Sequence, residues 1–405
     1  MHSSAPTYKE EEGSESDDPV VEVDITIDGS SDISQLITTL QTEGSSIETA
    51  TVKIHAESFV GRSLEEVISL FDAIGSLPSL RFLVLASRYA SNTFYELPVQ
   101  ALAALWQKAK HLQTFLMRLM ILAITDEDDQ AYERYFHIFE QWGNNLQNHQ
   151  SLREFRIENC RLSGDLLEIY PGALNPVVRG LSTIPTLQYA NFYSTENSNL
   201  GVPSGESLRF LFQSKTLERL GLRHFPLSAE HLHQICRALA HNTTLIELTL
   251  GPCIVKNRNQ DESIAQMLRE NSTLKRLIFK VECDNDTASP SSLLETAEAL
   301  KTNVALKDLT IWGSITDESQ KAFVTMMQSN YSIENLWIDG TQEQDREEIR
   351  FYAGLNEAGR GNILGNTNST RAQWLDSLIL SRNNLDALFY FLSTNPLLCT
   401  SNQPS

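Results

Sequence analysis

The chain of 405 residues lacks several features that would assign it to a common functional class. No apolar run approaches the roughly 18 residues that a membrane-spanning helix needs, and residues 1–19 are polar and acidic, unlike a signal peptide. The five cysteines form no CxxC pair and no Cys/His ligand spacing, so the sequence indicates neither a zinc site nor a disulfide framework. We therefore expect reduced thiols and a location in the cytoplasm or the nucleus.

The sequence also lacks the motifs that mark common enzymes. It contains no GxxxxGK[ST], GxSxG or HExxH, and no GxGxxG that opens a helix after a strand. The nine histidines are scattered, and His231 and His233, two apart on a predicted helix, lie on different faces, which disfavours a shared metal. We therefore predict no catalytic residue, no metal ligand and no cofactor, and we expect a protein that is not an enzyme.

Basic residues are few, with 32 Lys and Arg against 52 Asp and Glu, so the net charge is −20. More than half of this excess lies in the first 48 residues, where twelve acidic side chains accompany Lys9 alone. Phosphate backbones and anionic lipid surfaces attract basic proteins, so the balance argues against binding to nucleic acid or to a membrane. Residues 1–19 cannot bury enough apolar surface to fold, and we predict a disordered acidic tail there.

What the chain does contain is a repeated LxxLxL pattern, which is most regular in residues 217–340. Five copies begin at intervals of 28, 29, 32 and 27 residues. They are Leu217–Leu222, Leu245–Leu250, Leu274–Phe279, Leu306–Ile311 and Ile333–Ile338. A period of this length is typical of stacked repeats rather than of separate domains.

Each copy predicts one strand followed by one helix. The fourth and sixth residues of LxxLxL are apolar and alternate with polar neighbours, as in a strand with one face buried. After a turn, apolar residues recur at helical spacing, as at Leu232, Ile235 and Leu239 in the predicted helix 229–240. Because each turn can bury its apolar stripe only against its neighbours, we predict one α/β solenoid with parallel strands on the concave face and helices on the convex face.

This pattern resembles the leucine-rich repeat of the ribonuclease-inhibitor type. Near the C-terminus, Phe351–Gly361, Trp374–Asp376 and Leu385–Pro396 are similar to the tail of uncharacterised leucine-rich-repeat proteins of diatom-type algae. Those proteins have no established activity, so the resemblance implies a horseshoe fold and a binding function without naming a partner. One group with this repeat type activates GTPases through an Arg in a loop at one edge of the horseshoe, and Arg258 is the nearest candidate here.

The same pattern extends toward the N-terminus with less regular spacing. Five further strands are predicted, opening at Ile47, Leu80, Leu112, Leu152 and Leu187. Together the two sets give ten turns over residues 47–343. We predict an N-terminal cap over residues 20–46, where a strand-like alternation precedes a short helix, and a helical C-terminal cap over residues 344–405.

Several predicted turn residues occupy the same position in successive repeats. Three residues before the next opening Leu or Ile lie Asn242, Asn271, Asn303 and Asn330. We predict that these residues end the helices in the left-handed conformation, which Asn tolerates. Ser292 with Glu295 predicts a capping box at one helix start. The segment Gly359–Gly361, with Arg360 at its centre, predicts an exposed turn, and anion binding is the alternative.

The concave face carries the candidate binding residues. The third, fifth and seventh residues of the ten turns place thirty side chains on it, and their charges sum to +2 in a chain of net −20. Arg, Tyr and Trp dominate binding hot spots because they combine a large contact area with a polar group. We predict a partner-binding surface formed by Tyr189, Tyr193, Arg219, Arg223, Arg276, Lys280, Trp312 and Trp337.

Alternatives remain open from the sequence. The basic residues of this face could pair with acidic neighbours on the sheet, as Arg156 could with Glu154 and Glu158. The function could be the capture of another protein on the concave face, with an acidic segment of that protein as the contact, or it could be GTPase activation through Arg258. We expect the first function, a non-enzymatic protein–protein interaction scaffold.

Overall fold

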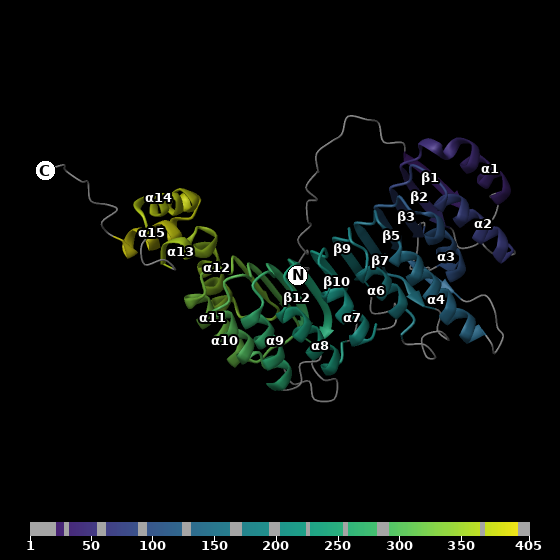
Figure 1. Cartoon of the computed structure of the whole chain (residues 1–405). Helices are drawn as coiled ribbons and strands as arrows, with labels where there is room; N and C mark the ends of the chain where they lie inside the picture. The colour runs from purple at the N-terminus through teal and green to yellow at the C-terminus, as the bar shows by residue number, and fades with distance from the viewer. Residues whose placement is uncertain are drawn as a thin grey trace.

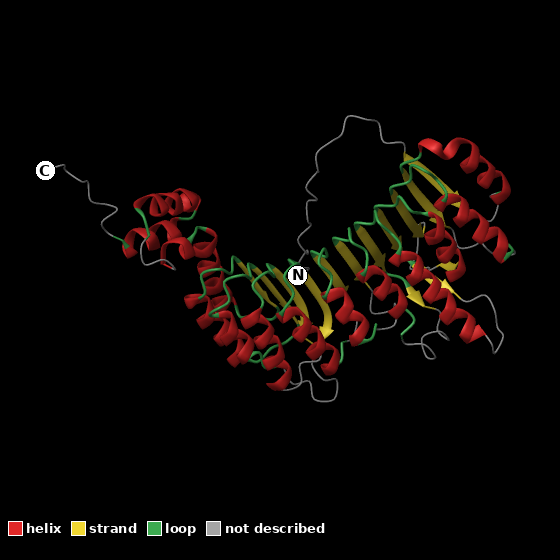
Figure 2. Ribbon diagram, in the orientation of Figure 1, coloured by secondary structure: helices red, strands yellow, loops and turns green. Residues whose placement is uncertain are grey.

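The structure, a computed structural model, describes residues 22–27, 32–54, 62–87, 95–123, 131–162, 172–193, 203–223, 227–253, 258–281, 291–364 and 369–395. Residues 1–19, for which the sequence predicts an acidic tail, lie outside the described residues. Strands and helices alternate along the chain and build an arc, with the sheet on its inner side and the helices on its outer side (Figures 1 and 2).

One parallel sheet contains eleven strands and runs the length of the arc. In spatial order they are β1 (Glu22–Ile27), β2 (Thr49–Ile54), β3 (Phe82–Ser87), β5 (Thr114–Arg118), β7 (Glu154–Glu158), β9 (Tyr189–Tyr193), β10 (Arg219–Arg223), β11 (Glu247–Cys253), β12 (Arg276–Val281), β13 (Asp308–Trp312) and β14 (Asn335–Ile338). All ten strands predicted from LxxLxL are present, and β1 adds one more at the N-terminal end. The predicted leucine-rich-repeat solenoid is confirmed as the fold.

Helices cover the outer side of the sheet in the order of the chain (Figure 2). They are α1 (Ile33–Glu43), α2 (Leu64–Gly75), α3 (Val99–Lys108), α4 (Ala131–Gln147), α6 (Asn175–Ser182), α7 (Gly205–Phe212), α8 (Ala229–Ala240), α9 (Arg258–Glu270), α10 (Leu294–Leu300), α11 (Asp317–Ser329) and α12 (Glu343–Glu357). Beyond the C-terminal end of the sheet, α13 (Arg360–Leu364), α14 (Arg371–Leu380) and α15 (Leu385–Thr394) form a helical group that packs on α12 (Figure 1). Each helix from α1 to α12 packs on the next, so the outer layer is continuous.

The register of the sheet follows from the repeat. The fourth residues of the last five turns lie directly opposite one another, and they are Leu220, Leu248, Leu277, Leu309 and Leu336. Each of them is buried between the sheet and the helices. Because a slip of one residue would turn all of these side chains to the solvent side, burial of the leucines fixes the pairing of these five strands.

A second, smaller sheet has no counterpart in the repeat pattern. It consists of β4 (Tyr95–Pro98), β6 (Met120–Ala123) and β8 (Arg161–Leu162), which pair in parallel. Two residues with positive φ, Leu119 at 60° and Asn159 at 52°, follow β5 and β7 directly. These residues bend the chain out of the main sheet, so short extra strands take up part of the additional length of the N-terminal turns.

The four asparagines do lie at helix-to-strand turns, but the left-handed conformation predicted for them is wrong. All have ordinary negative φ values and are buried. Asn303 Oδ1 accepts hydrogen bonds from the N–H groups of Ala305 and Leu306 at 3.0 and 2.8 Å, and its Nδ2 donates to the carbonyls of Leu268 and Asn271 at 2.6 and 3.3 Å. One side-chain amide thus satisfies backbone groups of two consecutive turns.

The predicted capping box of Ser292 and Glu295 is also wrong. Helix α10 begins at Leu294, and its N-terminal residue makes no side-chain capping hydrogen bond. Instead, the N–H groups of Glu295 and Thr296 donate to the carboxylate of Asp261 in α9, at 2.8 and 2.9 Å. A side chain of the preceding helix therefore satisfies the first turn of α10 and links two neighbouring helices of the outer layer.

The Gly359–Gly361 segment is not an exposed turn. Arg360 begins α13 and is fully buried, and its Nη2 donates to the carbonyl of Met327 at 2.7 Å. The guanidinium also lies 4.9 Å from the ring centres of both Tyr331 and Tyr352. Because its contacts are supplied by the chain itself and no part of it reaches solvent, the alternative prediction of an anion site at this segment is also wrong.

Candidate partner-binding face

Strand geometry places the third, fifth and seventh residues of each turn on the inner face of the arc. In β12, Leu277 and Phe279 are buried, whereas Arg276, Ile278 and Lys280 beside them are half-buried. The helices lie on the opposite side of the sheet (Figure 2), so the alternate side chains of the strands face solvent in the free protein.

The first group of candidate residues, here named the tyrosine–arginine cluster, comprises Arg156, Tyr189, Tyr193, Arg219 and Arg223. Tyr189 and Tyr193 on β9 lie directly opposite Arg219 and Arg223 on β10. The Cζ atom of Arg219 lies 4.6 Å from the ring centre of Tyr189, and the Cζ atom of Arg156, on the other neighbouring strand, lies 4.8 Å from it. Two guanidinium groups therefore hold Tyr189 through cation–π contacts.

The arginines of this cluster differ in their electrostatic surroundings. Arg156 Nε donates to Glu154 Oε1 at 2.6 Å, so the alternative prediction of pairing with an acidic neighbour is confirmed for this residue. Arg219 and Arg223 are exposed and form no ion pair within the described residues. Burial raises the pKa of Tyr189, so its hydroxyl stays protonated at neutral pH and can donate a hydrogen bond. Two cations that have no ion pair among the described residues thus face solvent beside a neutral phenol.

Arg276 is compensated by the chain itself. Its guanidinium nitrogens lie 3.7 Å from carboxylate oxygens of both Glu247 on β11 and Asp308 on β13. Partly exposed pairs of this kind contribute little stability, but they neutralise the local charge. The contribution of Arg276 to attracting an acidic partner is therefore expected to be smaller than that of Arg219 or Arg223.

The second group is the tryptophan pair, Trp312 on β13 and Trp337 on β14. Their ring centres are 6.5 Å apart with the planes at 52°, and the two residues are 45% and 37% exposed. Lys280 lies directly opposite Trp312 in the sheet. Two indoles that expose this much apolar surface to water on one face are typical of an interaction site rather than of a core.

Arg346 belongs to the same group, although the repeat pattern did not indicate it. Its Cζ atom lies 5.4 Å from the ring centre of Trp337, and its Nη2 donates to the carbonyl of Thr341 at 3.0 Å. Arg346 is in α12, the helix that follows the last strand, and the LxxLxL phase stops before it. The only sequence signal is its position one turn into a helix that starts directly after β14.

The structure divides seven of the eight predicted residues between two groups, and Arg276 lies between the groups. Strands β11 and β12 separate the tyrosine–arginine cluster from the tryptophan pair, a gap of three strand spacings or about 14 Å between β10 and β13. The Glu247–Arg276–Asp308 row lies in this gap. A partner that contacts both groups must therefore reach at least from β10 to β13, and one that covers both groups in full spans seven strands, from β7 to β14.

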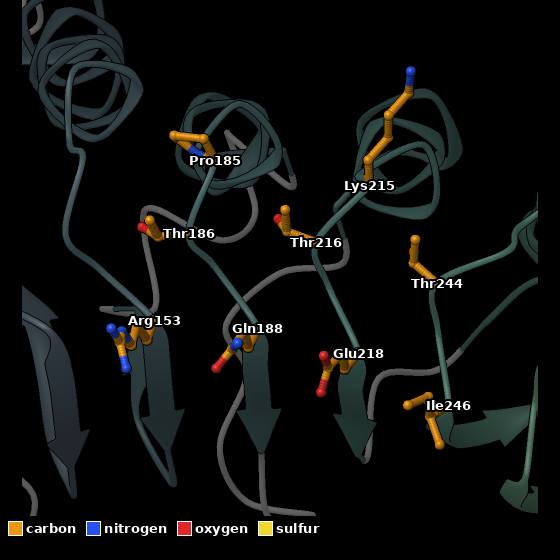
Figure 3. Close-up of a pocket in the computed structure, with 9 residues that line it drawn as sticks. All are labelled: Arg153, Pro185, Thr186, Gln188, Lys215, Thr216, Glu218, Thr244 and Ile246. Carbon is orange, nitrogen blue, oxygen red and sulfur yellow. The ribbon is translucent and has the colours of Figure 1, made fainter.

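A groove of about 510 Å³ opens at the edge of the sheet where β7, β9, β10 and β11 begin (Figure 3). The residue after the opening Leu of each turn contributes to it, namely Arg153, Gln188, Glu218 and Ile246. Its other lining residues are Pro185, Thr186, Lys215, Thr216 and Thr244. Because Gln188 and Glu218 directly precede Tyr189 and Arg219, this edge groove adjoins the tyrosine–arginine cluster.

The described residues bring together no group of three or more His, Cys, Asp or Glu that could hold a metal ion. Burial raises the pKa of Cys160 and of Cys236 to about 12, so neither thiol is a nucleophile at neutral pH. Arg258 begins α9, but its side chain lies outside the described residues, and its proposed part in GTPase activation stays a prediction. None of the helices that the structure describes combines the length and the apolar character needed to cross a bilayer.

No family model matches the chain, and no curated protein matches its sequence. Among solved structures, leiomodin-1 actin-binding site 2 is similar over 40% of this chain and 96% of its own length, with 16% identity and a TM-score of 0.32. The tropomodulin C-terminal domain of Caenorhabditis elegans is similar over 40% and 99%, with 11% identity and a TM-score of 0.30. A Bacteroides fragilis protein is similar over 76% and 70%, with 10% identity and a TM-score of 0.37.

Similarities this distant concern the fold alone. The function must therefore be argued from the surface of this chain. The resemblance to algal proteins of the same repeat type stays a prediction.

Proposed function

We propose that this protein is a non-enzymatic scaffold that binds a partner protein on the concave face of its horseshoe. In this proposal, an acidic segment of the partner contacts the tyrosine–arginine cluster. The observation that supports it most directly is the position of Arg219 and Arg223, two exposed cations without an ion pair among the described residues, on the inner face of a chain with net charge −20. Such a patch attracts carboxylates, whereas most of the remaining surface repels them.

The two groups of residues would contribute in different ways. Exposed charges steer encounter and set the salt dependence of binding, so Arg219 and Arg223 govern mainly the association rate. Large aromatic surfaces that lose water on contact govern mainly the dissociation rate, so Trp312 and Trp337 anchor the partner once it is bound. Lys280 and Arg346, which lie beside the indoles, would form the polar rim of this anchor.

The partner in this proposal is a protein rather than a nucleic acid or a membrane. A net charge of −20 repels phosphate backbones and anionic lipid head groups at a distance, and the local basic patch is too small to reverse that field. The cytoplasm or the nucleus is the proposed location.

The proposal is tested on a partner isolated by affinity capture from the native extract, with binding followed by surface plasmon resonance at several salt concentrations. The double variant Arg219→Ala/Arg223→Ala is expected to slow association and to weaken its salt dependence. Trp337→Ala is expected to speed dissociation and to cost about 2 kcal/mol, roughly a thirty-fold change in Kd. Arg237→Ala on α8, an exposed cation of the outer layer, is the matched control.

One set of binding results would contradict the proposal. If both concave-face variants bind like the wild type while Arg237→Ala or removal of residues 1–19 abolishes binding, the working surface is the outer layer or the tail. Thermal melts of all variants confirm that the substitutions act on binding rather than on folding.

A further inference from the structure

The edge groove carries two opposite charges, Arg153 and Glu218, that form no ion pair among the described residues. At the same edge position in the last two turns, Lys307 Nζ and Glu334 Oε1 lie 2.7 Å apart and form an ion pair. In the groove, Arg153 and Glu218 are separated by the turn of Gln188, and neither has an ion pair among the described residues. Two strand spacings put them about 10 Å apart, too far for direct contact. Opposite charges at this edge therefore form an ion pair in the last two turns, whereas Arg153 and Glu218 in the groove do not pair with each other.

Three threonines line the groove, and the chain itself engages the hydroxyls of two of them. Thr186 Oγ1 donates to the carbonyl of Leu152 at 2.8 Å, and Thr244 Oγ1 donates to the carbonyl of Ser214 at 3.0 Å. Because each of these hydroxyls already donates its proton to a main-chain carbonyl, neither is free to donate a hydrogen bond to a ligand. Ile246, which is 40% exposed, adds a larger apolar surface at one end.

The backbone at this edge cannot accept an additional strand. The carbonyl of Gln188 already accepts hydrogen bonds from the N–H groups of both Glu218 and Arg219, at 2.9 and 3.0 Å. The carbonyl of Glu218 accepts from Ile246 and Glu247 in the same way, at 2.7 and 3.0 Å. A ligand in the groove must therefore be recognised by its side chains rather than by its main chain.

Figure 3 shows Arg153, Gln188, Glu218 and Ile246 as a row across four successive turns, while Lys215 points away from that row. We propose that this row binds an extended peptide segment whose side chains are acidic opposite Arg153, basic opposite Glu218 and apolar opposite Ile246. The row has a fixed order of charge, so it selects among segments of the same composition.

Strand geometry sets the spacing of the segment. Neighbouring strands lie about 4.8 Å apart, and an extended chain advances about 3.3 Å per residue. The distance of two strands from Arg153 to Glu218 therefore corresponds to about three residues, and the single step from Glu218 to Ile246 to one or two. The segment carries Asp or Glu, then Lys or Arg three residues away, and then an apolar residue one or two positions further, in either chain direction.

This inference rests on the proposed function, because a partner on the tyrosine–arginine cluster would bring such a segment to the adjoining edge. Its test uses peptides alone. Labelled nine-residue peptides with Glu, Lys and Leu at the stated spacing, one in each chain direction, are titrated with the full chain and followed by fluorescence anisotropy. The control peptides have Glu and Lys exchanged.

The wild type is expected to bind one of the two peptides about five- to ten-fold more tightly than its exchanged control. Arg153→Glu and Glu218→Arg should each remove this preference, and the double variant should prefer the exchanged peptide instead. A preference that reverses with the charges requires direct contact with both side chains, since a general loss of structure would weaken every peptide alike.

Three results of the peptide titrations would overturn the inference, and a fourth comes from Arg219→Ala. The first three are no binding of either peptide, equal binding of peptide and exchanged control, and failure of the double variant to reverse the preference. If Arg219→Ala weakens peptide binding as much as Arg153→Glu does, the peptide occupies the tyrosine–arginine cluster, and the groove assignment falls while the proposed function stands. If the peptides bind as expected but the concave-face variants leave partner binding unchanged, the groove stands and the proposed function falls.

Discussion

The turns before β10 and the turns after it stabilise the same parallel sheet in different ways. Before β10, aromatic rings fill the space between sheet and helices. Trp106 in α3 lies 4.9 Å from Phe115 and 6.0 Å from Phe155, measured between ring centres, and Phe155 in turn lies 5.9 Å from Phe192. Successive rings therefore connect four turns through the core.

After β10, polar side chains connect the turns instead. Asn271 Nδ2 donates to the carbonyls of Leu239 and Asn242, Asn303 donates to Leu268 and Asn271, and Asn330 donates to Leu300 and Asn303. This asparagine ladder ends at Asn356, whose Nδ2 donates to Asn330 and Ile333 and whose Oδ1 accepts from Arg360 Nε at 2.8 Å.

The difference explains the spacing of the repeat. Burial of rings is non-directional, so turns of 40, 35 and 30 residues, which open at Leu112, Leu152 and Leu187, can be packed in succession. Hydrogen bonds require defined distances and angles, so turns joined by the ladder vary only from 27 to 32 residues. Regularity of the period is thus a consequence of how neighbouring turns are joined.

The largest loss of stability is expected from a charge at a buried strand position, because both regions depend on burial of the same strand residues. Leu248→Asp places a carboxylate at a position that is 1% exposed, with neither water nor a cation as partner, and should cost about 5 kcal/mol or more. Thr249→Asp, the adjacent residue on the concave face, is the control and should cost less than about 1 kcal/mol. Equal shifts in thermal melts would mean that the inward positions are assigned one residue out of register.

The next largest difference in stability is expected between two tryptophan variants, one before β10 at Trp106 and one after it at Trp337. Trp106→Ala removes a fully buried ring that contacts Phe115 and Phe155, and should cost about 4 kcal/mol in urea unfolding. Trp337→Ala removes a ring that is 37% exposed on the concave face, and should cost well under that, about 1 kcal/mol or less. If the second variant is as unstable as the first, Trp337 belongs to the core and not to a binding surface.

The ladder itself is tested by Asn303→Ala. This change leaves the N–H groups of Ala305 and Leu306 without acceptors in a buried turn, and should cost about 3 kcal/mol. Ser214→Ala, at the same phase where the ladder has not yet begun, removes only long hydrogen bonds of 3.3 and 3.4 Å and should cost less than about 1 kcal/mol. Similar costs for the two variants would contradict a special role for asparagine.

The smallest effect concerns His149. It lies in the turns before β10, at the repeat position that asparagine occupies in the later turns. Its Nδ1 accepts from the N–H groups of Ser151 and Leu152, at 3.3 and 3.1 Å, and its Nε2 lies 2.6 Å from the carbonyl of Ala109. The buried ring is therefore neutral, with its proton on Nε2, because a proton on Nδ1 would abolish both accepted bonds. Burial lowers the pKa of His149 below its ordinary 6.5, helped by the charges of Lys110 and His111, although the Ala109 hydrogen bond opposes the shift.

Linkage then fixes the sign of the pH dependence. The folded chain binds fewer protons at His149 than the unfolded chain, so the stability that the neutral ring provides is complete above pH 6.5 and is lost as the pH falls from 6.5 through the lower folded pKa. His149→Asn should supply the same acceptor without a titrating group. Urea unfolding at a series of pH values should show a smaller decrease below pH 6.5 for this variant than for the wild type, and identical slopes would contradict the assignment.

The sequence predicted the fold because apolar alternation determines it. Every opening Leu or Ile located a strand, and the phase of LxxLxL also placed Tyr189 and Arg219 on the concave face, whereas their direct contact was seen only in the structure. The second sheet was missed because its strands are short and lie in segments without a period. The mechanism of the asparagine turns was missed because their acceptors are main-chain carbonyls about 30 residues away in the chain.

Two arginines show why the candidate site was predicted only in part. Arg276 could have been matched to Glu247 and Asp308 from the register, but Arg346 could not be placed on this face, since it lies beyond the repeat. Arg360 was predicted to be exposed, because a charged residue between two glycines suggests a surface turn, but it is buried. Its burial depends on carbonyl groups and tyrosine rings that only the folded chain brings together.

The asparagine ladder also has a direction, and this direction agrees with the order in which a ribosome makes the chain. Each Nδ2 group donates to carbonyls of the turn before it, so the acceptors for a new turn exist as soon as the preceding turn has folded. Synthesis at about 5–20 residues per second would release one turn of this region every few seconds, N-terminal turns first. Each newly made turn would then find its hydrogen-bond acceptors already in place. Arg360, the last of these donors to be synthesised, would donate to the carbonyls of Met327 and Asn330 at the end of the ladder.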